Sequence, residues 1–359
     1  MPKYQVGIHG VGTSLPTMVR ENSAWPASFT AAFHDHARAD ISTPNPETEG
    51  GDAIARDVLG RYASDPFRGA QRRRVLEDGR QPSDLEVEAA ERAIACAEVD
   101  RSRIGLVLVT SQMPDLLIPG NAALVHHRLG LRPSALALNV DTTCTGFLGS
   151  MMLAAPQIAT GAADYALLVQ STVTSRCVDY SRPNSVNFGD GASAVVLGRV
   201  GDNRGILGWS WFNDGAYHRG AVLADPSGAP WYCAKKPLVA TTLDAAGGRE
   251  MVLKLGQLSN QAVEAALLDA NLTKRQVDFF GVHQPTAWFN EFCRRTCSMM
   301  ETTRTAQSFA ETASVGPANL PFCIEAGTRE GTLRAGDIAA LFSCGSGMNW
   351  GALVVRWGR

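Results

Sequence analysis

The sequence has no strong excess of charge of either sign. Its 359 residues include 33 Lys and Arg against 35 Asp and Glu, and only 19% of the chain is charged. Because the basic residues are spread along the chain, nucleic acid is an unfavourable partner. A hydrophobic content of 45% excludes disorder as a main theme and provides material for a large buried core.

Long apolar runs are also missing. No segment approaches the roughly 18 consecutive apolar residues that a transmembrane helix needs. Residues 1–12 contain one lysine and no long apolar region. We therefore expect a soluble, cytoplasmic protein without a membrane partner.

Cysteines are few and scattered. The chain has 8, too dispersed for a dense disulfide framework, so we expect reduced thiols. Cys293 and Cys297 lie one helical turn apart without a second pair of ligands, which disfavours zinc. The His-Asp-His run at 34–36 lies in an irregular polar stretch that is more typical of a solvated loop. We predict no metal, and the single glycine turn after residues 4–9 disfavours NAD.

The chain contains an internal repeat. Residues 84–97 have the spacing of an amphipathic helix capped by Ser83 or Asp84, and residues 104–109 follow as a buried strand. Residues 261–282 give the same order of helix, polar turn and strand at a shift of 173 residues.

The repeat divides the chain into two similar α/β halves, which we place at residues 1–203 and 204–359. Ligand sites in such folds form where equivalent strand ends meet. Residues 21–82 lack clear periodicity, and we interpret them as irregular structure that shapes the mouth of the site.

Cys144 follows an apolar run, 135–140, that has the length of a buried strand, and a small-residue helical pattern begins directly after it. At a helix start, unpaired backbone N–H groups and the helix dipole favour a thiolate, the nucleophilic form. The alternative is a buried cysteine that only packs.

His283 follows the predicted strand 279–282, and the repeat brings it towards Cys144. A histidine at a strand end is by itself often structural. A cysteine and a histidine in one cleft, however, form a nucleophile with a proton handler.

Four segments extend this pattern, namely DTTCTGF (141–147), NFGDGA (187–192), HQ (283–284) and GSGMNWG (345–351). Together they resemble the ketoacyl-acyl-carrier-protein synthase III family of the thiolase superfamily. The resemblance implies a five-layered αβαβα fold and a homodimer, with 114–131 as the dimer-forming region.

The resemblance also implies ping-pong acyl transfer. An acyl group from a CoA or acyl-carrier-protein thioester would be loaded onto Cys144 and passed to a second substrate. The CoA or phosphopantetheine thioester enters as substrate, and no cofactor is permanently bound.

In family terms, the backbone N–H groups of Cys144 and Ser346 form the oxyanion hole. His283 donates a hydrogen bond or handles the proton. Ser346 stands in a turn that is usually all glycine in the family. Asp141, Gln284 and Asn349 are expected to support these groups rather than to react.

Ser314 stands where the family normally has an asparagine, and we interpret it as an auxiliary donor. Glu311 or Asn319 could substitute only if the local turn differs from this alignment. Residues 315–318 also resemble the branch that condenses two acyl thioesters head to head.

Ser314 leaves two functions open. The first is Claisen-type carbon–carbon bond formation in a specialised pathway, either polyketide or fatty-acid-derived. The second is acyl transfer to a hydroxyl, an amine or a carrier without decarboxylation. A catalytically inactive acyl-binding homologue or heterodimer subunit is a third alternative, which the presence of Cys144 and His283 disfavours.

Basic side chains are candidates for contact with CoA phosphates or an acidic carrier protein, although each alone is more typical of a solvated face. They are Arg72, Arg73, Arg74, Lys254, Lys274 and Arg275.

Overall fold

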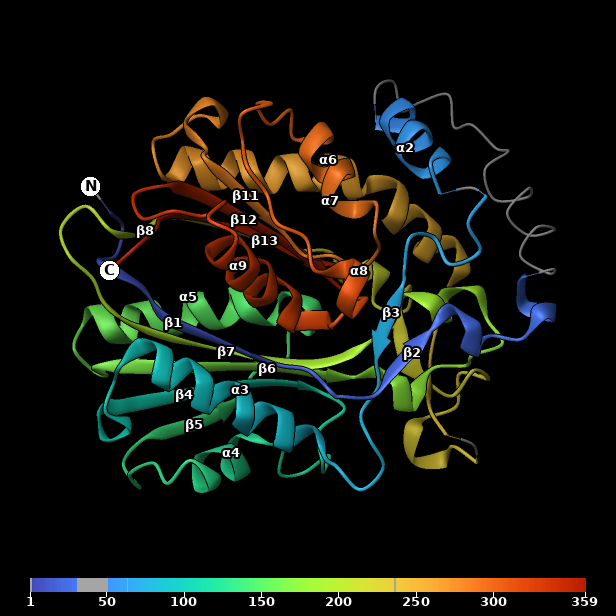
Figure 1. The fold of residues 1–359 in the computed structure, drawn as a ribbon, viewed down its shortest axis with the longest axis horizontal. Coiled ribbons are helices and arrows are strands. Elements are labelled where there is room, and N and C mark those ends of the chain that lie inside the picture. The colour runs from blue at the N-terminus through green and yellow to red at the C-terminus, as the bar shows by residue number, and fades with distance from the viewer. Residues whose placement is uncertain (1, 31–50, 63, 236) are drawn as a thin grey trace.

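Two mixed β-sheets organise the protein. The computed structural model describes residues 2–30, 51–62, 64–235 and 237–359 (Figure 1). The first sheet has five strands in the order β1-β7-β6-β4-β5. Their bounds are β1 Val6–Ser14, β4 Ile104–Gln112, β5 Leu136–Asn139, β6 Tyr165–Val173 and β7 Asp190–Arg199.

The second sheet has four strands in the order β11-β12-β13-β8. Their bounds are β8 Gly205–Asn213, β11 Phe279–Val282, β12 Ile338–Gly345 and β13 Asn349–Arg356. Each sheet contains a parallel pair, β4 with β6 in the first and β11 with β12 in the second. Two antiparallel strands follow each pair, β7 and β1 in the first sheet and β13 and β8 in the second. The edge strand β5 also pairs parallel with β4.

Helices cover both sheets and fill the space between them (Figure 1). The helices α5 and α9 share one apolar core with the inner faces of both sheets. The outer faces are covered by α3 with α4 on the first sheet and by α6 with α7 on the second. The five-layered αβαβα arrangement is therefore confirmed. The bounds are α3 Pro82–Ala97, α4 Ala122–Arg128, α5 Gly146–Ala159, α6 Ala245–Asp269, α7 Phe289–Thr296 and α9 Asn319–Arg329.

Within the stretch 21–82, the described residues 21–30, 51–62 and 64–82 are more regular than their sequence predicts. Helix α2, Gly51–Gly60, packs its Val58 into the core formed with α6 and α7. The strands β2, Val19–Glu21, and β3, Arg72–Arg74, pair antiparallel. The prediction of wholly irregular structure is wrong here because tertiary packing stabilises elements too short to show periodicity.

Smaller elements complete the fold. They are β9 Val222–Ala224, β10 Val239–Thr241, α8 Phe309–Thr312, and the 3-10 turns η1 Asn22–Ala24, η4 Thr174–Cys177, η5 Pro183–Asn187, η6 Gly215–Tyr217 and η7 Trp231–Cys233. None of the helices in the described residues has the length and apolar character needed to cross a membrane.

Two local predictions need correction. The cap of α3 is Gln81, whose backbone N–H donates to Asp84 while Pro82 takes the first helical position, so the predicted cap at Ser83 or Asp84 is wrong. The strand β5 is not buried. Leu136 and Leu138 are 55% and 45% exposed because β5 forms the edge of its sheet.

Candidate active site

Cys144 lies in a 3-10 turn, η3 (Thr143–Thr145), between β5 and the first residue of α5. Thr143 has φ of 49°, a left-handed conformation that β-branched residues rarely adopt. Its N–H donates to Asp141 Oδ1 at 3.2 Å, and its Oγ1 donates to the Ser346 carbonyl at 3.0 Å. These two bonds hold the turn that presents the cysteine.

The sulfur of Cys144 lies among hydrogen-bond donors. Gln112 Nε2, at the end of β4, is 3.9 Å from Sγ, and the backbone N–H groups of Ser346 and Cys144 also lower the pKa of the thiol. Burial raises the pKa of Cys144 to about 11, and these donors oppose the rise. The thiol is therefore the resting form at neutral pH. Desolvation therefore opposes the expected preference for a thiolate.

A second turn, between β12 and β13, is tied to the cysteine turn. Asn349 accepts a hydrogen bond from Thr145 Oγ1 at 2.5 Å and donates to the Ser346 carbonyl at 3.1 Å. Ser343 Oγ donates to the Cys144 carbonyl at 3.0 Å. Ser346 does not adopt a positive φ, so its Cβ is accommodated without backbone strain.

Gly345 lies where only a glycine fits. A Cβ there would lie 2.4 Å from Thr143 Oγ1 and 3.1 Å from the Cys144 nitrogen. This close approach lets the two turns meet at the sulfur.

His283 lies directly after β11, the strand that pairs with β12. The backbone N–H of His283 donates to the Phe342 carbonyl at 2.9 Å. Ser343, the residue after Phe342 on β12, donates through its Oγ to the Cys144 carbonyl. The ring is 2% exposed, and Nδ1 has no hydrogen-bond partner in the described part of the chain. Burial lowers the pKa of His283 to about 4, so the imidazole is neutral at pH 7.

Gln284 fixes the loop beyond the histidine. Its Oε1 accepts from the N–H groups of Ser308 and Phe309 at 3.0 and 3.1 Å, and its Nε2 donates to the Ala306 carbonyl at 3.0 Å. Gln284 therefore holds the segment that leads to Ser314.

Ser314 precedes the 3-10 turn η9 (Gly316–Ala318), which contacts η3. Its N–H donates to the Asn187 carbonyl at 2.8 Å, and its carbonyl accepts from Gly189 N–H at 3.0 Å. Its Oγ donates to Asn319 Oδ1 at 3.4 Å. The structure thus brings the turns of Cys144, His283 and Ser314 together.

The three arginines of β3 lie in different environments. Arg73 is 1% exposed, donates to the Val186 carbonyl at 2.8 Å and lies 4.5 Å from the Trp25 ring. Burial lowers the pKa of Arg73 to about 10. Arg72 is exposed and pairs with Glu311 at 2.9 Å, and Arg74 donates to the Pro16 carbonyl at 3.4 Å. Arg73 is therefore a core residue that a CoA phosphate does not reach.

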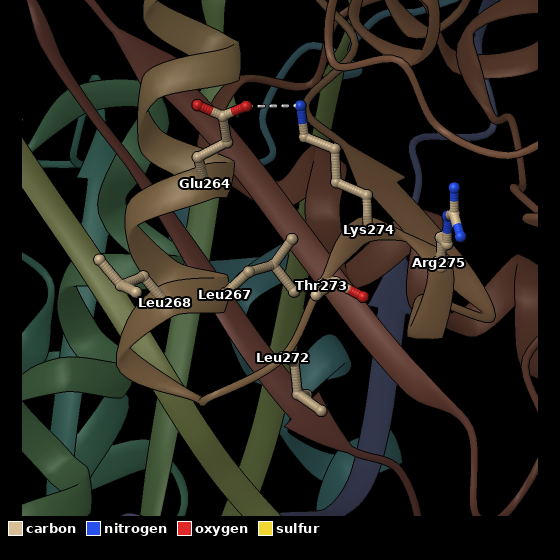
Figure 2. Close-up of a pocket in the computed structure, with 7 residues that line it drawn as sticks. All are labelled: Glu264, Leu267, Leu268, Leu272, Thr273, Lys274 and Arg275. Atoms are coloured by element: carbon tan, nitrogen blue, oxygen red, sulfur yellow. Dashed lines mark hydrogen bonds and ion pairs between the residues drawn. The ribbon is translucent and has the colours of Figure 1, made fainter.

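Lys274 and Arg275 lie at the opposite end of β11 from His283, since they precede the strand and the histidine follows it. They line an open hollow beside the end of α6, where Lys274 pairs with Glu264 at 2.7 Å (Figure 2). Lys254, on α6, pairs with Glu250 at 2.6 Å. The structure does not bring these three side chains to the Cys144 turn.

No group of three or more potential metal ligands occurs among the residues that the structure describes. The His-Asp-His run at 34–36 lies outside those residues. The side chains around the Cys144 turn are amides and hydroxyls, and a neutral imidazole follows the neighbouring strand β11, a set suited to acyl transfer.

Gln112 was not predicted as a site residue. Its signal is position: it is the last residue of an apolar strand whose carboxyl end meets the site, where functional side chains of α/β folds gather. Thr143, Thr145 and Ser343 were also missed. They act through hydrogen bonds to segments about 200 residues away, for which the sequence carries no local signal.

Comparison with known sequences agrees with this geometry. Residues 138–215 match the family described as 3-oxoacyl-[acyl-carrier-protein (ACP)] synthase III, and residues 267–357 match its C-terminal family. Beta-ketoacyl-[acyl-carrier-protein] synthase III of Alkalilimnicola ehrlichii is 32% identical over 289 residues, 80% of this chain and 87% of the relative. The Geobacillus kaustophilus protein of the same name is 32% identical over 296 residues, 81% and 88% of the two chains.

Solved structures show the same fold. The 3-oxoacyl-[acyl-carrier-protein] synthase III of Aquifex aeolicus superposes with a TM-score of 0.78 at 20% identity, covering 98% of this chain and 100% of that one. OleA of Xanthomonas campestris gives a TM-score of 0.78 at 22% identity, covering 99% of each chain.

The chain belongs to the 3-oxoacyl-[acyl-carrier-protein] synthase III family of thiolase-like condensing enzymes. It is a β-ketoacyl synthase III-like acyltransferase.

Proposed function

We propose that the protein forms carbon–carbon bonds by ping-pong acyl transfer through a thioester on Cys144. The observation that supports this proposal is the junction of two turns, in which Thr143 Oγ1 and Asn349 Nδ2 both donate to the Ser346 carbonyl beside the Cys144 turn. Backbone donors at a reacting sulfur are also placed to stabilise the oxyanion of a tetrahedral intermediate.

In the first half-reaction, the Cys144 sulfur attacks the carbonyl of an acyl thioester. A carbon–sulfur bond to Cys144 forms, the bond to the donor thiol breaks, and the thiol proton passes to the departing sulfur. Since burial holds the resting group as a thiol, its proton has to leave the sulfur at loading, and the neutral His283 imidazole is suited to accelerate that transfer without being essential to it.

In the second half-reaction, a malonyl thioester loses carbon dioxide, and the carbon nucleophile that remains attacks the acyl carbonyl on Cys144. A carbon–carbon bond forms, the carbon–sulfur bond to Cys144 breaks, and the sulfur leaves as a thiolate that is protonated again. His283, which is neutral, donates a hydrogen bond to the carbonyl of the second thioester, with Ser314 as an auxiliary donor. The altered donor at Ser314 supports a specialised pathway, polyketide or fatty-acid-derived, rather than fatty-acid initiation.

The substrates that we propose are CoA or acyl-carrier-protein thioesters, in keeping with the names of the relatives. Arg72 and Lys254 belong to the predicted basic set, and each forms an ion pair that is exposed to solvent, with Glu311 and Glu250 respectively. Because exposed ion pairs are weak, a phosphate or an acidic carrier protein can compete with these glutamates for the two basic side chains.

We also propose a homodimer through the edge of the first sheet. The outer side of β5 is unpaired in one chain, and Leu116, Leu117 and Ile118 beside it are 60%, 69% and 90% exposed. An exposed apolar sheet edge is typical of a chain that pairs with another copy. Light scattering on the wild type and on Leu138→Glu tests this pairing, since a dimer is expected only for the wild type.

The test of function has two stages. Incubation with acyl-CoA thioesters followed by intact mass is expected to show one acyl adduct, absent in Cys144→Ala and retained in Cys96→Ala. Malonyl-carrier protein is then added, and carbon dioxide release with a 3-oxoacyl product is expected.

Each stage can refute a separate part of the proposal. Absence of an adduct with every thioester would refute the enzyme mechanism and favour an acyl-binding homologue. An adduct whose acyl group passes to an alcohol or amine without carbon dioxide release would replace condensation with simple acyl transfer.

A further inference from the structure

Gln112 ends β4 inside the site, and its amide reaches the nucleophile. Nε2 lies 3.9 Å from Cys144 Sγ, so one N–H of the amide can donate to the sulfur. Hydrogen bonds to a charged sulfur are stronger than those to a neutral thiol. The bond therefore gains strength whenever Cys144 carries negative charge.

The other end of the amide lies close to the turn that follows Ser314. A Cβ built on Gly316 would lie 2.5 Å from Gln112 Oε1, and Gly316 has φ of 55°. Only glycine allows the backbone of η9 to pass this close to the amide. Gln112 thus lies between η9 on one side and the Cys144 turn on the other.

A buried polar network fixes the strand end that carries Gln112. Ser111 Oγ lies 3.0 Å from Ser171 Oγ, which donates to Glu86 at 2.5 Å. Asn121 Nδ2 donates to Glu86 at 2.9 Å and to Ser111 Oγ at 3.4 Å. Because these residues are hydrogen-bonded on the other face of β4, the end of the strand is set before substrate binds.

We propose that Gln112 is a catalytic residue whose amide N–H stabilises the Cys144 thiolate in both half-reactions. In loading, the thiolate is the nucleophile that forms the carbon–sulfur bond. In condensation, the carbon–carbon bond forms, that carbon–sulfur bond breaks, and the electron pair returns to the same sulfur. The proposal rests on the function proposed for Cys144.

The test uses Gln112→Met, which keeps the length of the side chain and removes the donor, and Gln112→Glu, which places a carboxylate beside the sulfur. The matched control is Gln170→Met. Gln170 lies on the inner face of the neighbouring strand β6, is fully buried and pairs in register with Thr110 rather than Gln112. Melting temperatures check that each variant folds.

The first measurement is the rate of Cys144 alkylation by iodoacetamide against pH, read by intact mass. In Gln112→Met we expect the apparent pKa of Cys144 to rise by about one unit and the rate at pH 7.5 to fall about tenfold. Gln112→Glu is expected to show a larger rise than Gln112→Met, and Gln170→Met none.

The second measurement is the single-turnover rate of each half-reaction, which should fall by similar factors in Gln112→Met. Alkylation profiles of folded Gln112 variants within twofold of the wild type would overturn the proposal, as would an equal shift in Gln170→Met. Since alkylation needs no acyl substrate, a wild type that alkylates normally but forms no acyl adduct would refute the proposed function, and with it the catalytic role of Gln112, while the alkylation profiles would still measure the hydrogen bond from Gln112 to Cys144.

Discussion

The two sheets share one plan and carry different chemistry. Strands β1, β7, β6 and β4 have the same order and directions as β8, β13, β12 and β11. The 3-10 turns before the parallel strands, η2 (Arg101–Arg103) and η8 (Lys274–Gln276), lie 173 residues apart. This correspondence supports the proposed division into residues 1–203 and 204–359.

The differences lie at the strand ends. The turn before α5 carries Cys144, whereas the turn before α9 carries Ser314 and Gly316. The end of β4 provides the amide of Gln112, and the end of β11 provides the imidazole of His283. A duplicated scaffold thus brings two sets of strand ends together, and each set holds different groups.

The outer helices differ in the same way. Glu86 on α3 and Ser259 on α6 are 173 residues apart, and both are fully buried. Burial raises the pKa of Glu86, which accepts bonds from Ser171 and Asn121. Ser259 donates to the Gly256 carbonyl within its own helix at 2.8 Å. Ser259 also lies 3.3 Å from Thr296 Oγ1 and accepts from Cys297 Sγ at 3.6 Å, so the second half has hydroxyl and thiol contacts where the first half has a carboxylate network.

The largest expected effect separates loading from condensation. His283→Ala is expected to slow condensation about 1000-fold, because the general acid–base group is lost. Adduct formation with an excess of acyl-CoA should still reach completion, since the sulfur and its donors remain. Single-turnover mass spectrometry of both steps measures this. Complete failure of loading would show that the second half is needed for both steps.

The next prediction concerns the buried network. Glu86→Ala is expected to lower the free energy of unfolding by about 3 kcal/mol, because Ser171 and Asn121 lose their acceptor in the core. Ser259→Ala should cost only about 1 kcal/mol. Urea denaturation compares the two variants, and equal losses would remove the contrast between the halves.

Stability should also depend on His283 through pH. Its folded pKa of about 4 lies below the ordinary value of 6.5, so between these values the unfolded chain binds the extra proton. Stability is therefore present above pH 6.5 and is lost as pH falls towards 4. The loss from pH 7.5 to 4.5 is about 2.5 kcal/mol. Urea denaturation of His283→Asn at both pH values should show a loss of unfolding free energy that is smaller than that of the wild type by this amount. The same pH dependence in the variant and the wild type would contradict the lowered pKa of His283.

The smallest effect is expected at Ser314. Its hydroxyl is a single donor that already bonds Asn319, so Ser314→Ala should lower condensation only about threefold, roughly the worth of one weak hydrogen bond. Loading should not change, and Ser314→Thr, which keeps the hydroxyl, is the control. Product formation after preloading measures the effect. A loss as large as that of His283→Ala would make Ser314 a principal donor.

Periodic segments could be predicted from the sequence because local physics decides them. The repeat of helix and strand at 84–109 and 261–282 predicted the layered α/β fold, and both pairs are present. Helix α2 and the pairing of β2 with β3 were not predictable, since they depend on distant partners. The burial of Arg73 had no local signal either, because its neighbours Trp25 and Val186 come from other segments.

The sequence by itself determined that a cysteine follows a strand and that a histidine ends a related strand. Only the tertiary structure decided the state of these groups. Burial makes Cys144 a thiol and His283 a neutral imidazole, and the meeting of β4, η3 and η9 places Gln112 at the sulfur. The physical reason is that desolvation and hydrogen-bond donors come from all surrounding segments, and the sequence next to a residue records only one of them.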